Sequence, residues 1–170
     1  MADGRDEDFA EFVLARTPAL LRFAYLVTGD AHLAEDLTQE ALVRAHRKWS
    51  SIVGDNGPEP YVRKIIMRQY LSWRRLGSST EIPVAAVPDG PARQGDGSDV
   101  VERDALWTML ASLTRMQRAV VVLRYYEDLA DEEIAQLLGV RRATVRVHAF
   151  HALATLRAAL AAAPTQEARA

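Results

Sequence analysis

Apolar and polar residues follow a helical period along most of this chain. From Asp8 to Val27 the apolar side chains recur at offsets of three and four residues, which predicts an amphipathic helix. The helical pattern returns from Ala31 to Trp49, from Tyr61 to Leu76 and from Val100 to Leu113. No stretch reads convincingly as a strand. The pattern therefore predicts an all-α fold.

Residues with capping chemistry mark where these helices begin and end. The segment Thr28–Asp30 breaks the first helix, and the Asp30 carboxylate can cap the second. Pro60 suits the first turn of the third helix. Thr114 and Gln117 form a capping-box pattern before the apolar run AVVVLRYY, which is therefore predicted to be a helix and not a strand.

The middle of the chain, from Gly77 to Asp99, has a different composition. It is rich in Gly, Pro, Ser and Asp and shows neither a helical nor a strand period. We therefore predict a flexible linker over residues 77–99. The flanks, residues 1–76 and 100–163, are then two small helical domains. Residues 164–170 are expected to form a disordered tail.

The second flank ends in two helices joined by a turn, from Asp131 to Arg157. Gly139 stands where the first of them should end, and glycine tolerates the left-handed conformation of such a turn. This arrangement is typical of a helix-turn-helix. One face of the second helix is predicted to point to the core, and it consists of Val145, Ala149, Ala152, Leu156 and Leu160.

The outward face of that second helix mixes cations with small apolar groups, which suits the major groove of duplex DNA. Arginine pairs with guanine or phosphate, and Val147 can contact a thymine methyl. Arg141 stands at the N-cap position without a side-chain acceptor, and a phosphate there would also offset its unfavourable charge at the helix start. Phe150 is predicted to be exposed. An ordinary helical hairpin remains the alternative.

The net charge of −2 is small, but the cations are concentrated in two segments. Tyr61–Arg75 and Ile134–Ala163 carry cations and no acid, whereas Asp3–Glu11 is mostly acidic. This distribution favours localised contact with a polyanion. Rings interleaved with cations also suit stacking on unpaired bases, with buried rings beside solvated cations as the alternative. The rings in the first basic segment are Tyr61, Tyr70 and Trp73.

The helix from Ala31 to Trp49 carries a second, more polar stripe at offsets of three and four residues. Such a stripe is usually a solvated face. The functional alternative is a docking surface with acceptors at one end and a cation at the other. This polar stripe consists of Asp36, Gln39, Glu40, Val43 and Arg47.

Composition excludes several kinds of site. The chain has no cysteine, so it forms neither disulfides nor thiolate metal sites. No apolar run approaches the ~20 residues of a membrane span, and the acidic start is unlike a signal peptide, so we expect a cytoplasmic protein. His148 and His151 lack a third ligand nearby. We expect no metal, no cofactor and no catalytic residue.

Together, these segments resemble the extracytoplasmic-function (ECF) sigma factors, members of the sigma-70 family of bacterial RNA polymerase subunits. The resemblance is in particular to the SigE-type subgroup of actinobacteria, and it covers nearly the whole chain outside the linker and termini. It is carried by LLRFAYLVTGDAHLAEDLTQEALVRAHRKW, by PYVRKIIMRQYLSWRR, and by RDALWTMLASLTRMQRAVVVLRYYEDLADEEIAQLLGV running into TVR, HAL and LR.

The resemblance implies that the first domain is sigma region 2. It also implies that the polar stripe from Asp36 to Arg47 docks on the clamp helices of the β′ subunit of core RNA polymerase. The loop Ser50–Pro60 captures a flipped base of the −10 element, and the helix after it meets −10 DNA. The −10 residues implied are Asp55, Asn56, Lys64, Arg68, Trp73, Arg74 and Arg75.

The second domain resembles sigma region 4, which reads the −35 element and rests on the flap of the β subunit. The −35 residues implied are Arg141, Arg142, Thr144, Arg146, Val147, His148 and His151. The chain departs from the usual family residues at several DNA-facing positions, which leaves its promoter sequence open. These positions are Arg68, Arg141, Val147, His148 and His151.

The resemblance implies a sigma factor that binds core RNA polymerase and directs promoter recognition, DNA opening and transcription initiation without catalysing the reaction. Its partners would be core polymerase and promoter DNA, both duplex and single-stranded, and an anti-sigma factor is left open. A stand-alone helix-turn-helix regulator is the alternative, although it gives the polar stripe from Asp36 to Arg47 no role. A helical interaction module that no longer reads DNA is a third hypothesis.

Overall fold

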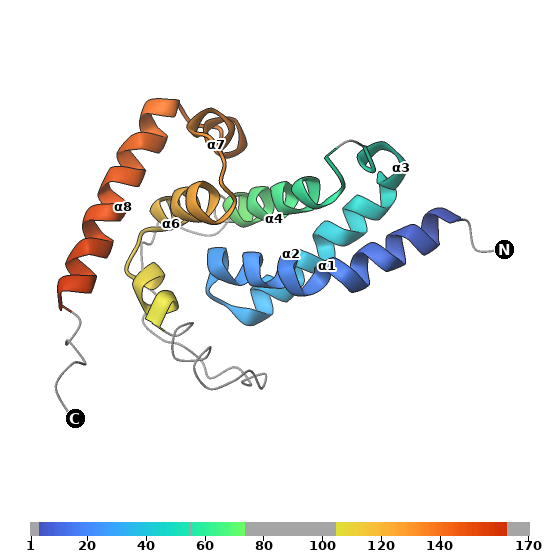
Figure 1. Ribbon diagram of the computed structural model, residues 1–170, viewed down its shortest axis with the longest axis horizontal. Coiled ribbons are helices and arrows are strands. Elements are labelled where there is room, and N and C mark those ends of the chain that lie inside the picture. Colours follow the sequence, from blue (N-terminus) through green and yellow to red (C-terminus); the bar gives the residue numbers. More distant parts are fainter. Residues whose placement is uncertain (1–3, 55, 74–104, 163–170) are drawn as a thin grey trace, which may run out of the picture. The chain divides into compact units, whose positions relative to one another are not determined.

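The computed structural model describes residues 4–54, 56–73 and 105–162 (Figure 1). The chain divides into two compact units, Met1–Ile82 and Pro83–Ala170. All regular structure in the described residues is helical, which confirms the predicted all-α fold class. The segments predicted to be a linker, residues 77–99, and a tail, residues 164–170, lie outside the described residues.

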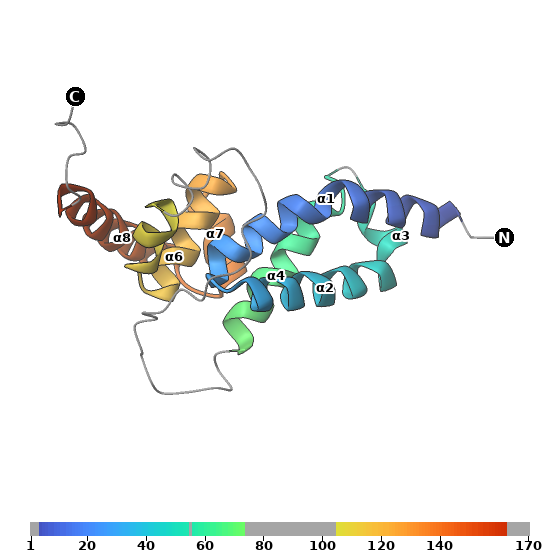
Figure 2. The ribbon, with the colours of Figure 1, turned by 90° about the horizontal axis from the view of Figure 1, so that it is seen from below.

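The first unit is a small helical bundle. Its elements are α1 (Gly4–Thr28), α2 (Ala31–Arg47), α3 (Trp49–Ile52) and α4 (Glu59–Trp73). Helices α1, α2 and α4 all pack against one another, and Figure 2 shows α1 and α2 running side by side. The shared core consists of Leu20, Phe23, Ala24 and Val27 from α1, Ala34, Leu37, Ala41 and Ala45 from α2, and Val62, Ile66 and Met67 from α4.

The turn between α1 and α2 forms as the sequence predicts. Gly29 has a φ of 70°, in the left-handed region that glycine enters without a steric penalty. The Asp30 carboxylate then accepts a hydrogen bond from the Leu33 N–H at 2.9 Å. This N-cap satisfies one of the backbone donors that a helix start leaves free.

The loop predicted from Ser50 begins instead with the short helix α3. The Trp49 side chain is buried, and its ring lies 5.1 Å from that of Phe9 and 5.3 Å from that of Phe12. The Ser51 hydroxyl donates to the Lys48 carbonyl at 2.7 Å. Burial of the Trp49 ring therefore holds the chain close to the bundle for one further turn after α2.

The second unit contains a helix over residues 105–111, α6 (Arg115–Val121), the π-helix η1 (Val122–Tyr126), α7 (Asp131–Leu138) and α8 (Arg142–Ala162). The predicted capping box is confirmed, because the Gln117 N–H donates to Thr114 Oγ1 and the Thr114 N–H donates to Gln117 Oε1. The π-helix was not predicted. It places Val122 and Leu123 in the core, where both are almost fully buried.

Helix α8 packs against α6 and α7 through the beginning of its apolar face. Val145, Ala149 and Ala152 are buried, as predicted. The prediction for Leu160 is wrong, because its side chain is 58% exposed. The buried residues of α8 end at Ala152, so the end of the helix extends beyond the surface that covers its start.

Arg118 is a buried cation in the second unit and has a structural role. Its Nε–H donates to the Leu110 carbonyl at 3.0 Å, and its guanidinium lies 5.1 Å from the centre of the Trp107 ring. A buried charge needs such partners, because desolvation without them is costly. Arg118 therefore joins α6 to the helix over residues 105–111.

Candidate nucleic-acid interface

The outward face of α8 carries the side chains that the sequence predicts there. Val147 is 53% exposed and Phe150 is 68% exposed. Arg146 and His151 are also exposed, whereas Thr144 and His148 are half-buried. The Phe150 and His151 rings contact each other edge to face at 5.6 Å. The result is a ridge of apolar, aromatic and cationic groups on a helix that a groove can admit.

The start of α8 is held by the turn after α7. Gly139 has a φ of 68°, and the following Val140 N–H donates to the Ala135 carbonyl at 3.0 Å. Arg141 directly precedes α8, and its carbonyl accepts the N–H groups of Thr144 and Val145. The Arg141 side chain is exposed, so this helix start is open to solvent and carries a cation.

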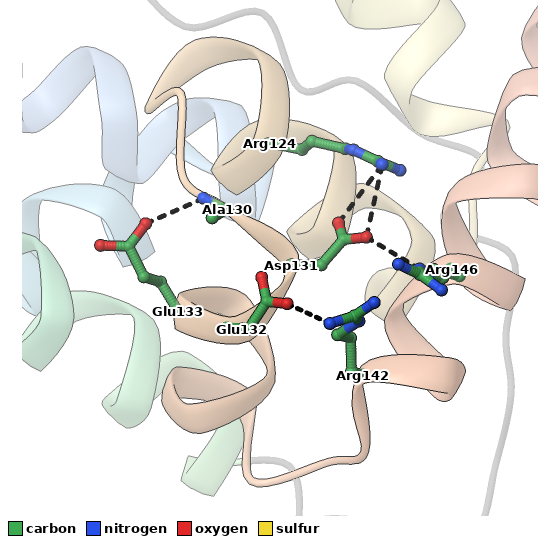
Figure 3. A network of polar contacts seen from close by, with 7 residues as sticks. All are labelled: Arg124, Ala130, Asp131, Glu132, Glu133, Arg142 and Arg146. Carbon is green, nitrogen blue, oxygen red and sulfur yellow. Dashed lines mark hydrogen bonds and ion pairs between the residues drawn. The ribbon is translucent and has the colours of Figure 1, made fainter.

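Acidic residues in the first turn of α7 bind two arginines of α8, as Figure 3 shows. Asp131 Oδ2 accepts a hydrogen bond from Arg146 Nε at 3.3 Å. Arg124 Nη2, from η1, lies 3.3 Å from Asp131 Oδ1. Glu132 forms an ion pair with Arg142. We call Arg124, Asp131, Glu132, Arg142 and Arg146 the α7–α8 charge network.

The acids of α7 also stabilise their own helix. Ala130, at the N-cap position, has no side-chain acceptor, but its N–H donates to Glu133 Oε2 at 2.8 Å. The negative charges of Asp131, Glu132 and Glu133 lie at the positive end of the helix dipole. The predicted site did not include these acids. Their signal is the run DEE at 131–133 shortly before arginines 142 and 146, but only the packing of α7 on α8 shows that they meet.

The polar stripe of α2, called the α2 stripe from here on, is exposed along its whole length: Asp36, Gln39, Glu40, Val43 and Arg47 are all solvent-accessible. Val43 is 53% exposed and is the one apolar member of the stripe. Within the stripe, Glu40 forms an ion pair with Arg44, one turn further along the helix. The stripe is therefore open to a partner, and its docking role stays a prediction.

The residues predicted to meet −10 DNA lie on α4, on the loop before it and after its end. Lys64 and Arg68 are exposed on α4, and Asn56 is exposed in the loop. The Trp73 backbone ends α4, but its side chain is outside the described part of the structure, as are Asp55, Arg74 and Arg75. The structure therefore places Lys64 and Arg68 one turn apart on one solvent-facing helix.

Two members of the first basic segment have a structural role instead. Tyr70 is 2% exposed, so its ring lies in the core and is not available to stack on a base. Arg63 has a side chain that is 15% exposed and pairs with Glu59 at 2.5 Å. Its guanidinium also lies 5.2 Å from the centre of the Phe23 ring. Composition alone overstated the free positive charge of α4.

Glu59 is the acceptor that fixes the start of α4. It binds Arg63 and also Arg16 of α1. Burial raises the pKa of the Glu59 carboxyl, but hydrogen bonds and charges from Arg63 and Arg16 outweigh it, so the pKa lies below its ordinary value. Glu59 is therefore a charged anchor between α1 and α4 at neutral pH.

The described residues hold no group of three or more His, Cys, Asp or Glu side chains placed to bind a metal ion. His148 and His151 accordingly have no third ligand in this part of the chain. Among the described helices, none is both long and apolar enough to cross a membrane.

Comparison with known proteins identifies both units. Residues 12–79 match the family Sigma-70 region 2, and residues 103–156 match Sigma-70, region 4. The RNA polymerase sigma-E factor of Streptomyces avermitilis is 36% identical over 92% of this chain and 87% of its own length. This chain belongs to the sigma-70 family. The resemblance described from the sequence is thereby confirmed.

Other relatives in this family support the same placement. The RNA polymerase sigma-E factor of Streptomyces coelicolor is 34% identical over 91% of this chain and 87% of its own length. The ECF RNA polymerase sigma factor SigL of Mycobacterium tuberculosis is 28% identical over 83% of this chain and 82% of its own length. The chain is therefore a sigma-70 family member with ECF relatives.

The fold also matches a solved structure. A chain of the co-crystal structure of the sigma factor RpoE in complex with the anti-sigma factor NepR from Bartonella quintana superposes with a TM-score of 0.68. The two chains are 23% identical, and the match covers 92% of this chain and 99% of the other. At this identity the likeness establishes the fold.

Proposed function

We propose that this protein is a sigma factor that binds core RNA polymerase and directs promoter recognition, DNA opening and transcription initiation. The observation that carries the proposal is that regions 2 and 4 both occur in one chain, in an order shared with sigma-E factors over 92% of its length. As a specificity subunit it acts in the cytoplasm and does not itself form phosphodiester bonds.

The two units would divide the work at the promoter. Region 2, proposed over residues 1–76, docks on the β′ subunit through the α2 stripe and receives the opened −10 element along α4. Region 4, proposed over residues 100–163, anchors the duplex at the −35 element through α8 and rests on the β subunit. Unstacking bases costs a few kcal/mol each, so region 2 must offset this cost with contacts to single-stranded DNA.

Binding by two linked units fits the modest size of each site. Among the described residues, each proposed DNA-binding surface presents only two or three exposed cations, which are Lys64 and Arg68 in the first unit and Arg141, Arg142 and Arg146 in the second, so neither surface is expected to bind DNA tightly alone. When both are held on polymerase, the second contact becomes intramolecular and gains from a high effective concentration. The residues proposed for the −10 and −35 elements are those given from the sequence, with Lys64, Arg68 and Arg146 supported by their exposure.

The runner-up is a helix-turn-helix regulator that binds duplex DNA without polymerase. It accounts for α7 and α8, but it gives no role to the exposed α2 stripe or to a region 2 match over residues 12–79. An anti-sigma factor is compatible with either function and remains an open partner.

The test combines core-polymerase capture with transcription from a supercoiled template. Wild-type protein should be retained by core polymerase, and the holoenzyme should initiate at defined promoters. Failure to bind core polymerase would refute the proposal and favour the runner-up. Binding without promoter-dependent transcription would instead favour an interaction module.

Paired variants separate the two surfaces. Asp36→Ala should weaken core binding, whereas Glu35→Ala, on α2 outside the stripe, should leave it unchanged. Arg146→Ala should weaken binding that depends on the −35 element, whereas Arg157→Ala, at an exposed position further along α8, should not. If Asp36→Ala and Arg146→Ala both behave as wild type, the proposed sites are wrong.

A further inference from the structure

Arg146 is held by one edge of its guanidinium and is free at the other. Its Nε–H donates to Asp131 Oδ2 at 3.3 Å, while its side chain remains 58% exposed. Within the described residues, no hydrogen bond or ion pair reaches its two Nη groups. A guanidinium is planar and carries its donors in a fixed fork, so a contact at Nε orients the terminal edge without occupying it.

Asp131 is itself fixed independently of Arg146. Its side chain is only 12% exposed, and a carboxylate that is largely removed from water needs a cation nearby. Arg124 meets that need from η1: its Nη2 lies 3.3 Å from Oδ1 and donates a hydrogen bond to Oδ2 at 3.5 Å, the oxygen that Arg146 also contacts (Figure 3). Asp131 thus stays in place and neutralised whether or not Arg146 is engaged elsewhere.

Arg142 shows the opposite arrangement. Glu132 binds its terminal Nη1, and both side chains are at least half exposed. To present both terminal Nη groups to DNA, Arg142 must first leave Glu132, whereas Arg146 can keep its contact with Asp131. Arg146 therefore has both terminal Nη groups free to contact DNA, whereas one terminal Nη group of Arg142 is already paired.

We propose that Asp131 is a positioning residue that orients Arg146 for reading a guanine in the major groove. The two free Nη groups match the O6 and N7 acceptors of guanine, the partner that arginine recognises most specifically. An arginine without this support would turn to the nearest phosphate, which carries no sequence information. The inference rests on the proposed function, namely that α8 reads the −35 duplex.

The experiment uses holoenzyme assembled from the full chain and actinobacterial core polymerase. Wild-type holoenzyme selects promoters from a pool randomised over the −35 segment, and every single-base variant of the selected sequence is then measured. The variants are Asp131→Ala, Arg146→Ala, the double variant, and Glu132→Gln as the matched control, which removes an acid from the same turn of α7.

Wild type should prefer guanine at one position, and Arg146→Ala should lose that preference by about fivefold or more, the lower end for one bidentate arginine–guanine pair. Asp131→Ala should lose the same preference at the same position without lowering the salt dependence of binding, because Arg146 retains its charge and turns to a phosphate. The double variant should select as Arg146→Ala does. Glu132→Gln should keep the wild-type preference.

The inference would be overturned, while the proposed function stands, by either of two results for Asp131→Ala. The variant could keep the guanine preference, or it could change the base preference at a different promoter position from Arg146→Ala. Wild-type holoenzyme that selects no −35 sequence would refute the proposed function, and this inference with it.

Arg146→Lys gives a test that does not depend on the stability of the Asp131 variant. Lysine keeps the charge but has no fork, so it cannot hold Asp131 and both guanine acceptors together. It should weaken the guanine preference without lowering the salt dependence. A lysine variant with the wild-type preference would also overturn the inference.

Discussion

Glu132→Gln should strengthen binding to promoter duplex modestly and to the same degree for every sequence. Glu132 holds Arg142 in an ion pair whose side chains are 57% and 50% exposed. Such exposed pairs are typically worth about 0.2–1 kcal/mol. If Arg142 must leave Glu132 to reach a phosphate, removing the pair should raise affinity by about 1.4- to 5-fold.

The same reasoning fixes the effect of removing the arginine. Each phosphate contact contributes about 0.9 to the slope of log affinity against log salt concentration, so Arg142→Ala should lower that slope by about 0.9. Between about 50 and 200 mM salt, this corresponds to a difference of roughly 3.5-fold in affinity. Neither variant should alter base preference, because phosphate contacts carry no direct sequence information.

The assay is titration of a labelled duplex, selected by wild type, with holoenzyme over a range of salt concentrations. Glu133→Gln is the matched control, because it removes the same charge from the same turn of α7. The Glu133 carboxylate accepts the Ala130 N–H and pairs with no arginine in the described residues. Equal gains for Glu132→Gln and Glu133→Gln would show a general charge effect and refute the competition. A loss of affinity for Glu132→Gln would refute it as well.

Three predictions concern stability. Thr38→Val should raise the free energy of unfolding by about 1 kcal/mol. The buried Thr38 hydroxyl has no hydrogen-bond partner in the described residues, and such burial costs about 1–3 kcal/mol. A lower melting temperature for the variant would contradict this prediction. Arg118→Met should reduce it by roughly 2 kcal/mol, the scale of a hydrogen bond to a charged group, and an unchanged denaturant midpoint would argue against that role. Glu59 has a pKa below its ordinary value of 4.5, so its stabilisation is present above that pH and lost as pH falls through the folded-state pKa. Glu59→Gln should therefore be less stable near neutrality and approach wild type in acid, and urea unfolding with a pH-independent difference would disprove it.

Helices and their starts were predictable where a local rule applied. The Asp30 cap, the Thr114–Gln117 box and the Gly139 turn each depend on a few neighbouring residues, and each forms as predicted. The π-helix η1 and the short helix α3 were not predictable in this way. They depend on where Val122, Leu123 and Trp49 are buried, and burial is decided by the rest of the bundle.

The sequence predicted which helix faces of the candidate interface are at the surface, but it did not predict which of their cations are paired with acids. Helical period correctly placed Val147, Phe150 and the α2 stripe at the surface. The helical period did not separate Lys64 and Arg68, which are exposed, from Arg63, whose largely buried side chain pairs with Glu59. All three are cations on α4, and Arg63 differs because it pairs with Glu59 and packs beside the Phe23 ring of α1.

Charge along the chain and charge in space differ most at the helix-turn-helix. In the sequence, the stretch from Ile134 to Ala163 contains arginines and no acid, so its positive charges have no acidic partner within the stretch. In the fold, Asp131 and Glu132, just before that stretch, pair with two of its arginines. Asp131 contacts Arg146 at Nε, and Glu132 contacts Arg142 at Nη1. Arg142 is held at Nη1, a terminal group, so on the proposed function its pair with Glu132 should compete with DNA and lower non-specific affinity. Arg146 is held at Nε, so its pair leaves the donors for base recognition free. The first turn of α7 can therefore weaken binding and sharpen its selectivity together, which a count of positive residues on α8 does not reveal.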